Sequence, residues 1–294
     1  MPASQSPDRP PSSSRFNTFI SDWEPAPART PAGVSIWAIG DVHGHLDHLM
    51  ALLAAVERRI AAAPAGPHHL VMLGDTIDRG PDNLAALRRA TTLEIPGVTT
   101  TALWGNHEEY LDTFLNDEGA GEDFLRFWAA NGGLTTLENL GLSREVVSSR
   151  DPIEVIAQGR RLAPASVRDS LERLKMGMRL GGYLFVHAGV HPRHGLEDKD
   201  IQRLTTIREP FLTGEAWSHD FAVVHGHSII GPDVLPHRIS VDSGAYHTGV
   251  LSCVELRDDQ ARFISVTQDE TLDGLLKIRR RRPLSGETWK RFEG

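Results

Sequence analysis

Cysteine is almost absent from the sequence: the 294 residues include one, Cys253. An intrachain disulfide is therefore impossible, and a zinc site built from several cysteines is excluded. No apolar run approaches the roughly 18 residues that a membrane-spanning helix requires, and the N-terminus lacks the basic and apolar segments of a secretory signal peptide. These absences predict a cytoplasmic protein that has no membrane partner.

Positive charge is also in deficit. Lysine and arginine number 31 against 39 aspartate and glutamate residues, which gives a formal net charge of −8. Since non-specific nucleic-acid binding depends on excess lysine and arginine, no nucleic-acid partner is expected, although a local basic pocket for phosphate is compatible with this composition. The hydrophobic content of 40% and the charged content of 24% are ordinary for a globular protein with a sizeable core.

The chain divides into three parts by composition. Residues 1–32 are rich in proline, serine and alanine and are expected to form a disordered or loosely ordered tail. Residues 33–268 are expected to form one domain, in which about residues 115–180 make a helical insertion. Residues 269–294 make a basic C-terminal extension, whose Arg279–Arg282 run is interpreted as solvated, with a phosphate or partner contact as the alternative.

Buried-strand patterns and helical patterns alternate in the first half of the domain. Strands are predicted over residues 34–39, 70–73 and 98–103, and helices over residues 46–60 and 82–91. This alternation implies an α/β fold with a largely parallel sheet, and such sheets bind ligands outside the carboxyl ends of their strands. Further strands are predicted over residues 183–186, 221–224, 237–242, 249–256 and 261–267.

Polar residues that can bind a metal follow five of these strands. They are Asp41 and His43, Asp75 and Asp78, Asn106 and His107, His187, and His227. Each has an ordinary explanation when taken alone, because an aspartate after a strand often caps the next helix or forms a turn. Together, carboxylate, amide and imidazole groups suit divalent ions such as Mn²⁺, Fe²⁺ and Zn²⁺.

The blocks that contain these residues resemble the signatures of a known family. The first three blocks are Gly40-Asp41-Val42-His43-Gly44, Gly74-Asp75-Thr76-Ile77-Asp78-Arg79-Gly80 and Gly105-Asn106-His107-Glu108, and His187-Ala188-Gly189 and Gly226-His227-Ser228 follow. They resemble the five blocks of the calcineurin-like metallophosphatases, especially the bacterial and phage members of the phosphoprotein phosphatase branch. Weaker similarities lie at Asn131-Gly132-Gly133 and at residues 207–211. The resemblance covers about residues 34–256 and implies a four-layer α-β-β-α sandwich with a helical insertion near the active site.

The resemblance also implies two divalent metal ions per chain, with manganese as the first expectation and iron or zinc as alternatives. By this likeness Asp41 and His43 bind the first ion, and Asp75 bridges both ions. The second ion takes the ligands Asn106, His187 and His227. Two cations held by one short carboxylate lower the pKa of a water and neutralise phosphoryl charge, as two-metal hydrolases require.

Catalytic and substrate-binding roles follow from the same likeness. His107 is the expected general acid, and Asp78 is expected to hydrogen-bond it, with a helix cap as the alternative role for Asp78. Arg79, Asn106 and Arg208 are expected to bind phosphate oxygens, with a surface salt bridge as the alternative for Arg208. His225 is expected to approach the site from the same strand face as His227 without ligating.

The expected function is metal-dependent hydrolysis of phosphomonoesters, with a serine/threonine protein phosphatase as the first interpretation. The expected partners are therefore a phosphoprotein or a small phosphoester. Trp104 stands where the family usually has arginine, which replaces a phosphate clamp by a surface that could stack on a base. A symmetrical diadenosine tetraphosphate hydrolase is therefore an alternative. An alternative of another class is a non-catalytic binding module on the same fold, which is disfavoured because every expected ligand and His107 are present.

Overall fold

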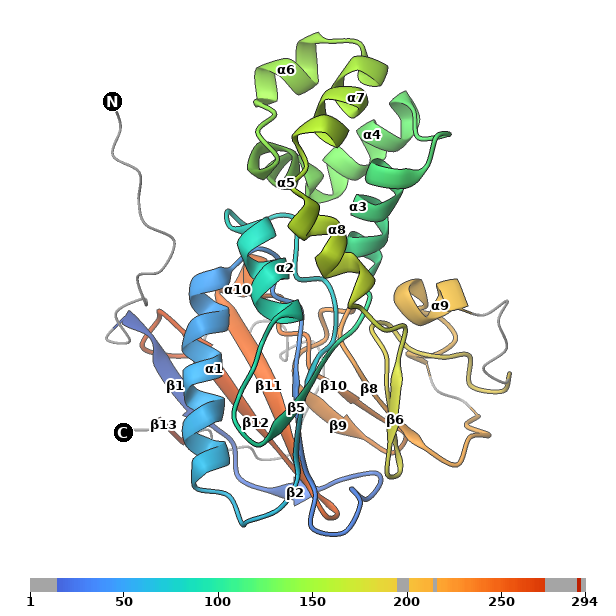
Figure 1. Ribbon diagram of the computed structural model, residues 1–294. Coiled ribbons are helices and arrows are strands. Elements are labelled where there is room, and N and C mark those ends of the chain that lie inside the picture. The colour runs from blue at the N-terminus through green and yellow to red at the C-terminus, as the bar shows by residue number, and fades with distance from the viewer. Residues whose placement is uncertain (1–14, 195–200, 214–215, 273–289, 292–294) are drawn as a thin grey trace.

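The computed structural model describes residues 15–194, 201–213, 216–272 and 290–291 of the chain. Two β-sheets pack face to face, with helices outside them (Figure 1). In the described part of the chain, the larger sheet has eight strands in the order β13-β1-β12-β11-β3-β4-β5, with β2 paired to β12. The smaller sheet has five strands in the order β6-β7-β8-β10-β9.

The parallel centre of the large sheet confirms the predicted alternation of strands and helices. Its strands are β3 (Ser35–Ile39), β4 (His68–Met72) and β5 (Val98–Ala102), and each pairs in parallel with the next. The connecting helices are α1 (Leu46–Ala61) and α2 (Asn83–Thr91), whose apolar faces pack on the sheet. All three strands therefore end at the same edge, where the Gly-Asp and Gly-Asn turns lie.

The rest of the large sheet is antiparallel. It consists of the hairpin β11 (Val250–Arg257) and β12 (Gln260–Thr267), and of the short strands β1 (Asn17–Ile20), β2 (Glu24–Pro25) and β13 (Lys290–Arg291). For residues 15–32 the structure contradicts the expected loose tail, because β1 and β2 pair with β12 through backbone hydrogen bonds. Residues 1–14 and the Arg279–Arg282 run lie outside the described residues.

The small sheet lies on the other side of a shared apolar layer. Its strands are β6 (Met178–Leu180), β7 (Tyr183–Phe185), β8 (Ala222–His225), β9 (Asp233–Leu235) and β10 (Arg238–Ser240). Between the sheets lie residues such as Val71, Leu73 and Phe185, and on the outer face Phe211 and neighbouring side chains pack below α9 (Ile201–Thr206). Helices, two sheets and the thin α9 layer form the expected four-layer sandwich.

The helices between β5 and β6 stand at the carboxyl-end edge of the large sheet (Figure 1). They are α3 (Asn106–Asn116), α4 (Glu122–Trp128), the π-helical turn η2 (Ala129–Gly133), α5 (Leu134–Asn139), α6 (Arg144–Ser149), α7 (Pro152–Leu162) and α8 (Ala165–Glu172). We call residues 122–172 the helical insertion. Its core includes Trp128, Leu137 and Val155, which are buried against Phe114 of α3.

A last short helix, α10 (Ala245–Thr248), precedes β11. Among the described residues, no helix has the length and apolarity needed to span a membrane.

Candidate active site

The loops after β3, β4, β5, β7 and β8 meet at one end of the two sheets and bring the predicted site residues together. Several of these residues have a left-handed backbone, which is unfavourable for side chains other than glycine. Five of the six non-glycine residues with positive φ in the described chain are site candidates: His43, Asp75, Asp78, Arg79 and His227. Strain of this kind persists where surrounding structure enforces it, and it concentrates at functional sites.

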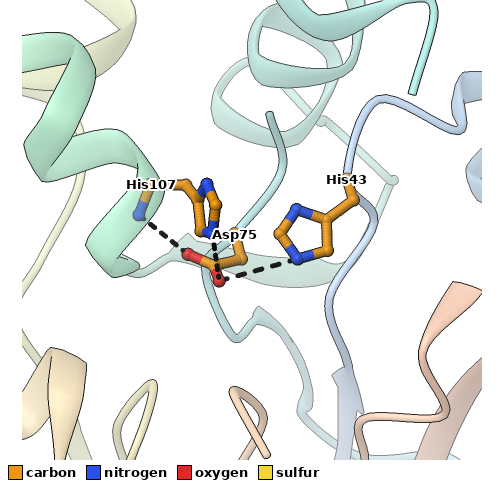
Figure 2. A group of neighbouring side chains, drawn as sticks. All are labelled: His43, Asp75 and His107. Atoms are coloured by element: carbon orange, nitrogen blue, oxygen red, sulfur yellow. Dashed lines mark hydrogen bonds and ion pairs between the residues drawn. The ribbon is translucent and has the colours of Figure 1, made fainter. Parts of the chain in front are cut away.

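Asp75 lies at the centre of the constellation. Its Oδ2 is 3.2 Å from His187 Nε2, 3.7 Å from His43 Nε2 and 3.9 Å from His107 Nε2, and its Oδ1 accepts a hydrogen bond from the His107 backbone N–H at 3.1 Å. Figure 2 shows Asp75 between the rings of His43 and His107. Asp75 therefore faces imidazoles that come from both sheets.

Two groups of possible metal donors share Asp75. One contains His43, Asp75 and His107, the other contains Asp75, His187 and His227, and the donor atoms within each group lie within 4.8 Å of one another. A carboxylate common to two groups has the arrangement that a bridging ligand needs. Asp41 is the expected partner of His43, whereas the first group contains His107 in that place.

Asp41 and Asn106 lie at the edges of these groups. The Asp41 carboxylate is buried and accepts the His227 backbone N–H at 3.0 and 3.1 Å. Burial and the neighbouring carboxylate of Asp242 raise its pKa well above the usual value. Asn106 Oδ1 lies 3.2 Å from His187 Nε2, so the amide oxygen faces the second group.

The electrostatics of the site suit cations. Burial disfavours charge on Asp75 and His187, but their mutual attraction prevails: the pKa of Asp75 lies well below its usual value, and that of His187 is raised to about 10. Burial lowers the pKa of His43 well below 6.5 and the pKa of His227 to about 3, so both imidazoles are neutral and can offer a lone pair. Buried carboxylates, the neutral imidazoles of His43 and His227 and an amide oxygen therefore form a donor set that fits Mn²⁺, Fe²⁺ or Zn²⁺. His187 would have to release its proton to join this set.

Asp78 and His107 form a buried pair. Asp78 Oδ2 lies 2.6 Å from His107 Nδ1 and accepts a hydrogen bond from Trp128 Nε1 at 2.7 Å, while Oδ1 accepts one from the hydroxyl of Thr136. Asp78 does not cap α2, because Asp82 is the residue before the first turn of that helix. The Asp78 carboxylate instead contacts His107, Trp128 and Thr136. Trp128 and Thr136 were not predicted as site residues, and they lie about 50 and 58 residues further along the chain than Asp78.

Glu108 is a third residue whose role was not predicted from the sequence. It is fully buried, and its carboxylate accepts backbone N–H groups of Asp75 at 2.8 Å, Thr76 at 2.7 Å and Gly105 at 3.0 Å. It therefore fixes the loop after β4 against the loop after β5. The available signal was its place at the third position of α3, from which a glutamate side chain can accept the backbone N–H of the N-cap residue Gly105.

Arg79 enters the site from the loop after β4. Its guanidinium contacts His43 Nε2 and lies 4.3 Å from the ring centroid of Tyr246. Its backbone N–H donates to the Gly132 carbonyl at 3.0 Å, and a Cβ at Gly132 would lie 2.5 Å from Arg79 Cγ. Position 132 therefore requires glycine, because of this close approach and because its φ is 108°. This requirement explains the glycine at the centre of the Asn131-Gly132-Gly133 motif.

Arg208 is exposed, and its guanidinium donates to Ser228 Oγ at 3.1 Å and to the His227 carbonyl at 3.4 Å. These contacts hold Arg208 beside the second donor group. Its partners among the described residues are a hydroxyl and a carbonyl, so the alternative of a salt bridge to a carboxylate is not observed there. Arg79 and Arg208 both line a cavity of about 260 Å³. Its lining residues are Asp75, Arg79, Asn106, His107, Tyr110, Asn131, Thr206, Arg208 and His227.

Trp104 does not line this cavity. It lies at a separate cavity of about 150 Å³, together with residues of α3 and α8 that include Asp112 and Arg168. Its backbone N–H donates to the Lys175 carbonyl at 2.9 Å, which ties the residue to the segment after α8. The structure therefore does not support the interpretation of Trp104 as a stacking surface in the phosphate cavity.

His225 also differs from expectation. Strand β8 ends at His225, and the backbone of His227 is left-handed, with φ of 60°. The strand alternation that places residues two apart on one face therefore does not extend to His227. The His225 ring instead packs against Phe211 at 4.9 Å and lies 3.4 Å from Arg238. Burial lowers the pKa of His225 to about 3, so it is a neutral residue outside the cavity.

The fold and the paired donor groups define a metal-dependent phosphoester hydrolase. A family model of the calcineurin-like phosphoesterases matches residues 34–266, so the chain belongs to this family. This membership confirms the resemblance seen in the five blocks and the enzymatic, metal-dependent class. The alternative of a non-catalytic module has no support among these findings.

The curated relatives of this chain are named either bis(5'-nucleosyl)-tetraphosphatases or serine/threonine-protein phosphatases. An asymmetrical bis(5'-nucleosyl)-tetraphosphatase of Halalkalibacterium halodurans is 25% identical over 277 residues, which cover 87% of this chain and 98% of the relative. A symmetrical bis(5'-nucleosyl)-tetraphosphatase of Bordetella parapertussis is 30% identical over 195 residues, which cover 65% of this chain and 56% of the relative. Serine/threonine-protein phosphatase 2 of Salmonella typhimurium is 36% identical over 99 residues, 33% of this chain and 38% of that protein.

A solved metallophosphoesterase from Sphaerobacter thermophilus is similar in structure, with a TM-score of 0.44, 17% identity, and coverage of 85% of this chain and 94% of that one.

Proposed function

We propose that this phosphoesterase cleaves a phosphoanhydride bond of bis(5'-nucleosyl) tetraphosphates. The support is the extent of the similarity: the tetraphosphatase of Halalkalibacterium halodurans aligns with 87% of this chain. A serine/threonine protein phosphatase, the first interpretation from the sequence, is the second candidate. It is favoured by the 36% identity with the Salmonella phosphatase, which is limited to 99 residues.

The observation that carries the proposed chemistry is the position of Asp75 in both donor groups. Asp75 would bridge two divalent ions, with Asp41 and His43 completing one site and Asn106, His187 and His227 the other. Bound ions supply the Lewis acidity that activates water and neutralises charge on the phosphoryl oxygens. Glu108 would keep the Asp75 loop in place through its three backbone hydrogen bonds.

His107 is the proposed proton donor to the leaving oxygen. Asp78 holds its Nδ1 at 2.6 Å, which leaves Nε2 to face the cavity and to deliver a proton there. Trp128 and Thr136 restrain the Asp78 carboxylate and thus the orientation of the imidazole. Arg79, Arg208 and the amide of Asn106 would hold the phosphate oxygens within the cavity.

The test is a paired assay of diadenosine tetraphosphate and a phosphothreonine peptide after chelation and after addition of Mn²⁺. We expect no turnover of either substrate in chelator, recovery with Mn²⁺, and a higher kcat/KM for the dinucleotide. Two ADP molecules would indicate symmetrical cleavage, and ATP with AMP would indicate asymmetrical cleavage. A higher kcat/KM for the peptide would favour the second candidate, and undiminished turnover in chelator would overturn both.

His107→Asn is the matched variant for the proton donor. Metal content should stay near that of the wild type, while kcat falls by about 10²–10⁴-fold, the usual contribution of a general acid. The loss should shrink for p-nitrophenyl phosphate, whose leaving group needs little protonation. Equal losses for alkyl and aryl phosphates would contradict the assigned role.

A further inference from the structure

A row of rings leads from the candidate metal residues to the surface of the helical insertion. The rings of His43 and His107 lie 4.8 Å apart, the Tyr110 ring lies 5.3 Å from His107, and the Phe127 ring lies 5.2 Å from Tyr110. Phe127 ends the row and is 49% exposed despite its large apolar side chain. It therefore presents an aromatic surface to solvent close to a polar cavity.

Local contacts hold this ring pair at the cavity mouth. Tyr110 and Asn131 both line the cavity, and Asn131 Nδ2 donates to the Phe127 carbonyl at 2.8 Å. The Tyr110 hydroxyl accepts a hydrogen bond from Asn106 Nδ2 at 3.2 Å, which fixes Tyr110 to the site itself. The pair thus begins inside the cavity with Tyr110 and ends outside it with Phe127.

We propose that Tyr110 and Phe127, here termed the aromatic shelf, bind the nucleobase of the leaving nucleotide. This inference rests on the proposed function and specifies a substrate contact for it. Since His107 is the proposed donor to the leaving oxygen, rings that continue the row beyond His107 contact the leaving group rather than the transferred phosphoryl group. Aromatic side chains bind bases through their faces and tolerate any base, because every base has a π-face.

The spacing and the charges fit a nucleotide. Phe127 is two ring contacts beyond His107, a separation that suits a base joined through its ribose to the phosphate whose oxygen His107 would protonate, as in AMP. Arg79 and Arg208 line the cavity from which the shelf extends, so the phosphate chain would meet cations and the base would meet rings. An alkyl leaving group such as a serine side chain would leave the shelf without a partner.

The experiment compares inhibition constants of AMP and ribose 5-phosphate against hydrolysis of p-nitrophenyl phosphate by the Mn²⁺-loaded full chain. Phe127→Ala should raise the constant for AMP by about 5- to 20-fold, the lower part of what base–aromatic stacking contributes elsewhere. The constant for ribose 5-phosphate should change by less than about twofold, because this ligand carries no base. Phe127→Trp keeps an aromatic face and should retain AMP binding.

Ile153→Ala is the matched control, because Ile153 is another exposed apolar residue of the helical insertion, 71% exposed, and does not line the cavity. It should leave both constants unchanged. Equal changes for AMP and ribose 5-phosphate in Phe127→Ala, or no change in either, would overturn the shelf. So would an effect confined to a phosphopeptide with an aromatic residue beside the phosphoserine, since the shelf would then bind a peptide side chain.

The outcome for the shelf is separable from that for the proposed function. A wild type that prefers phosphopeptides to diadenosine tetraphosphate would contradict the proposed substrate, while the ratio of the two inhibition constants would still decide whether the rings bind a base. Conversely, a preference for the dinucleotide with no effect of Phe127→Ala would keep the proposed substrate and reject the shelf.

Discussion

The strand-end loops and the helical insertion contribute to the site in different ways. The loops carry the donors of the two groups around Asp75, and each loop is a short block in which the residue and its backbone turn come together. The insertion carries none of these donors but contacts the residues beside them: Trp128 and Thr136 bind Asp78, and Gly132 fits against Arg79. The donor groups thus depend on short local blocks of sequence, whereas the pair of Asp78 and His107, which holds the proposed proton donor, depends on packing between distant segments.

Asp75→Asn should have the largest effect, because it changes the one residue common to both donor groups. Loss of a residue that only orients a ligand already costs about 10–100-fold in metal affinity or activity, and a shared ligand should cost more. We expect less bound metal per chain and a loss of kcat above about 10³-fold. Metal analysis of the purified variant beside the wild type checks this, and a normal metal content would contradict the bridging role.

Arg208→Gln should have the next largest effect and should act on substrate rather than on metal. Hydrogen bonds to charged groups contribute about 1.5–3 kcal/mol, so kcat/KM should fall by about 10- to 150-fold. Arg79 contacts His43 as well as the cavity, so Arg79→Gln should also alter metal content, whereas Arg208→Gln should not. Metal analysis together with kcat/KM for one phosphoester separates the two arginines. Unchanged kcat/KM in Arg208→Gln would place it outside the substrate contacts.

Trp128→Phe and Thr136→Val test the contribution of the insertion directly. Each removes one hydrogen bond to the buried Asp78 carboxylate, so kcat should fall by about tenfold with metal content retained. The loss should be greater for alkyl than for nitrophenyl leaving groups, since Asp78 acts through His107. Thr136→Ser keeps the hydroxyl and should restore activity. If Thr136→Ser and Thr136→Val lose the same activity, the hydrogen bond is not what matters.

The sequence predicted those parts of the site in which a functional residue and the backbone turn that positions it lie within a few residues of each other. The parallel strands, the five blocks and the convergence of Asp75, His107 and His187 were all accessible, because parallel strands end at one edge of a sheet. The role of Trp128 could not be predicted in the same way. An apolar residue on a helix predicts burial, and nothing in its spacing shows that its indole N–H meets Asp78 about 50 residues earlier.

The N-terminal segment was missed for a related reason. Residues 15–32 have little periodicity, but an edge strand needs only backbone hydrogen bonds to a neighbour, and β12 supplies them. A second attachment comes from the small sheet, where Tyr183 donates its hydroxyl to the Ala28 carbonyl at 2.5 Å. Composition shows neither partner, because both lie more than 150 residues away along the chain.

Tyr183→Phe tests this attachment and should have the smallest effect. Burial raises the pKa of Tyr183 to about 12, from about 10 in an unfolded chain, so the folded state keeps the phenol proton over a range in which the unfolded state loses it. The resulting stability is complete below pH 10 and is lost as the pH rises to about 12, at up to about 1.4 kcal/mol per pH unit. Denaturant unfolding from pH 9 to 12 should therefore show a steeper decline for the wild type than for Tyr183→Phe. Parallel curves for wild type and Tyr183→Phe would show that the Tyr183 hydroxyl does not contribute to the pH dependence of stability.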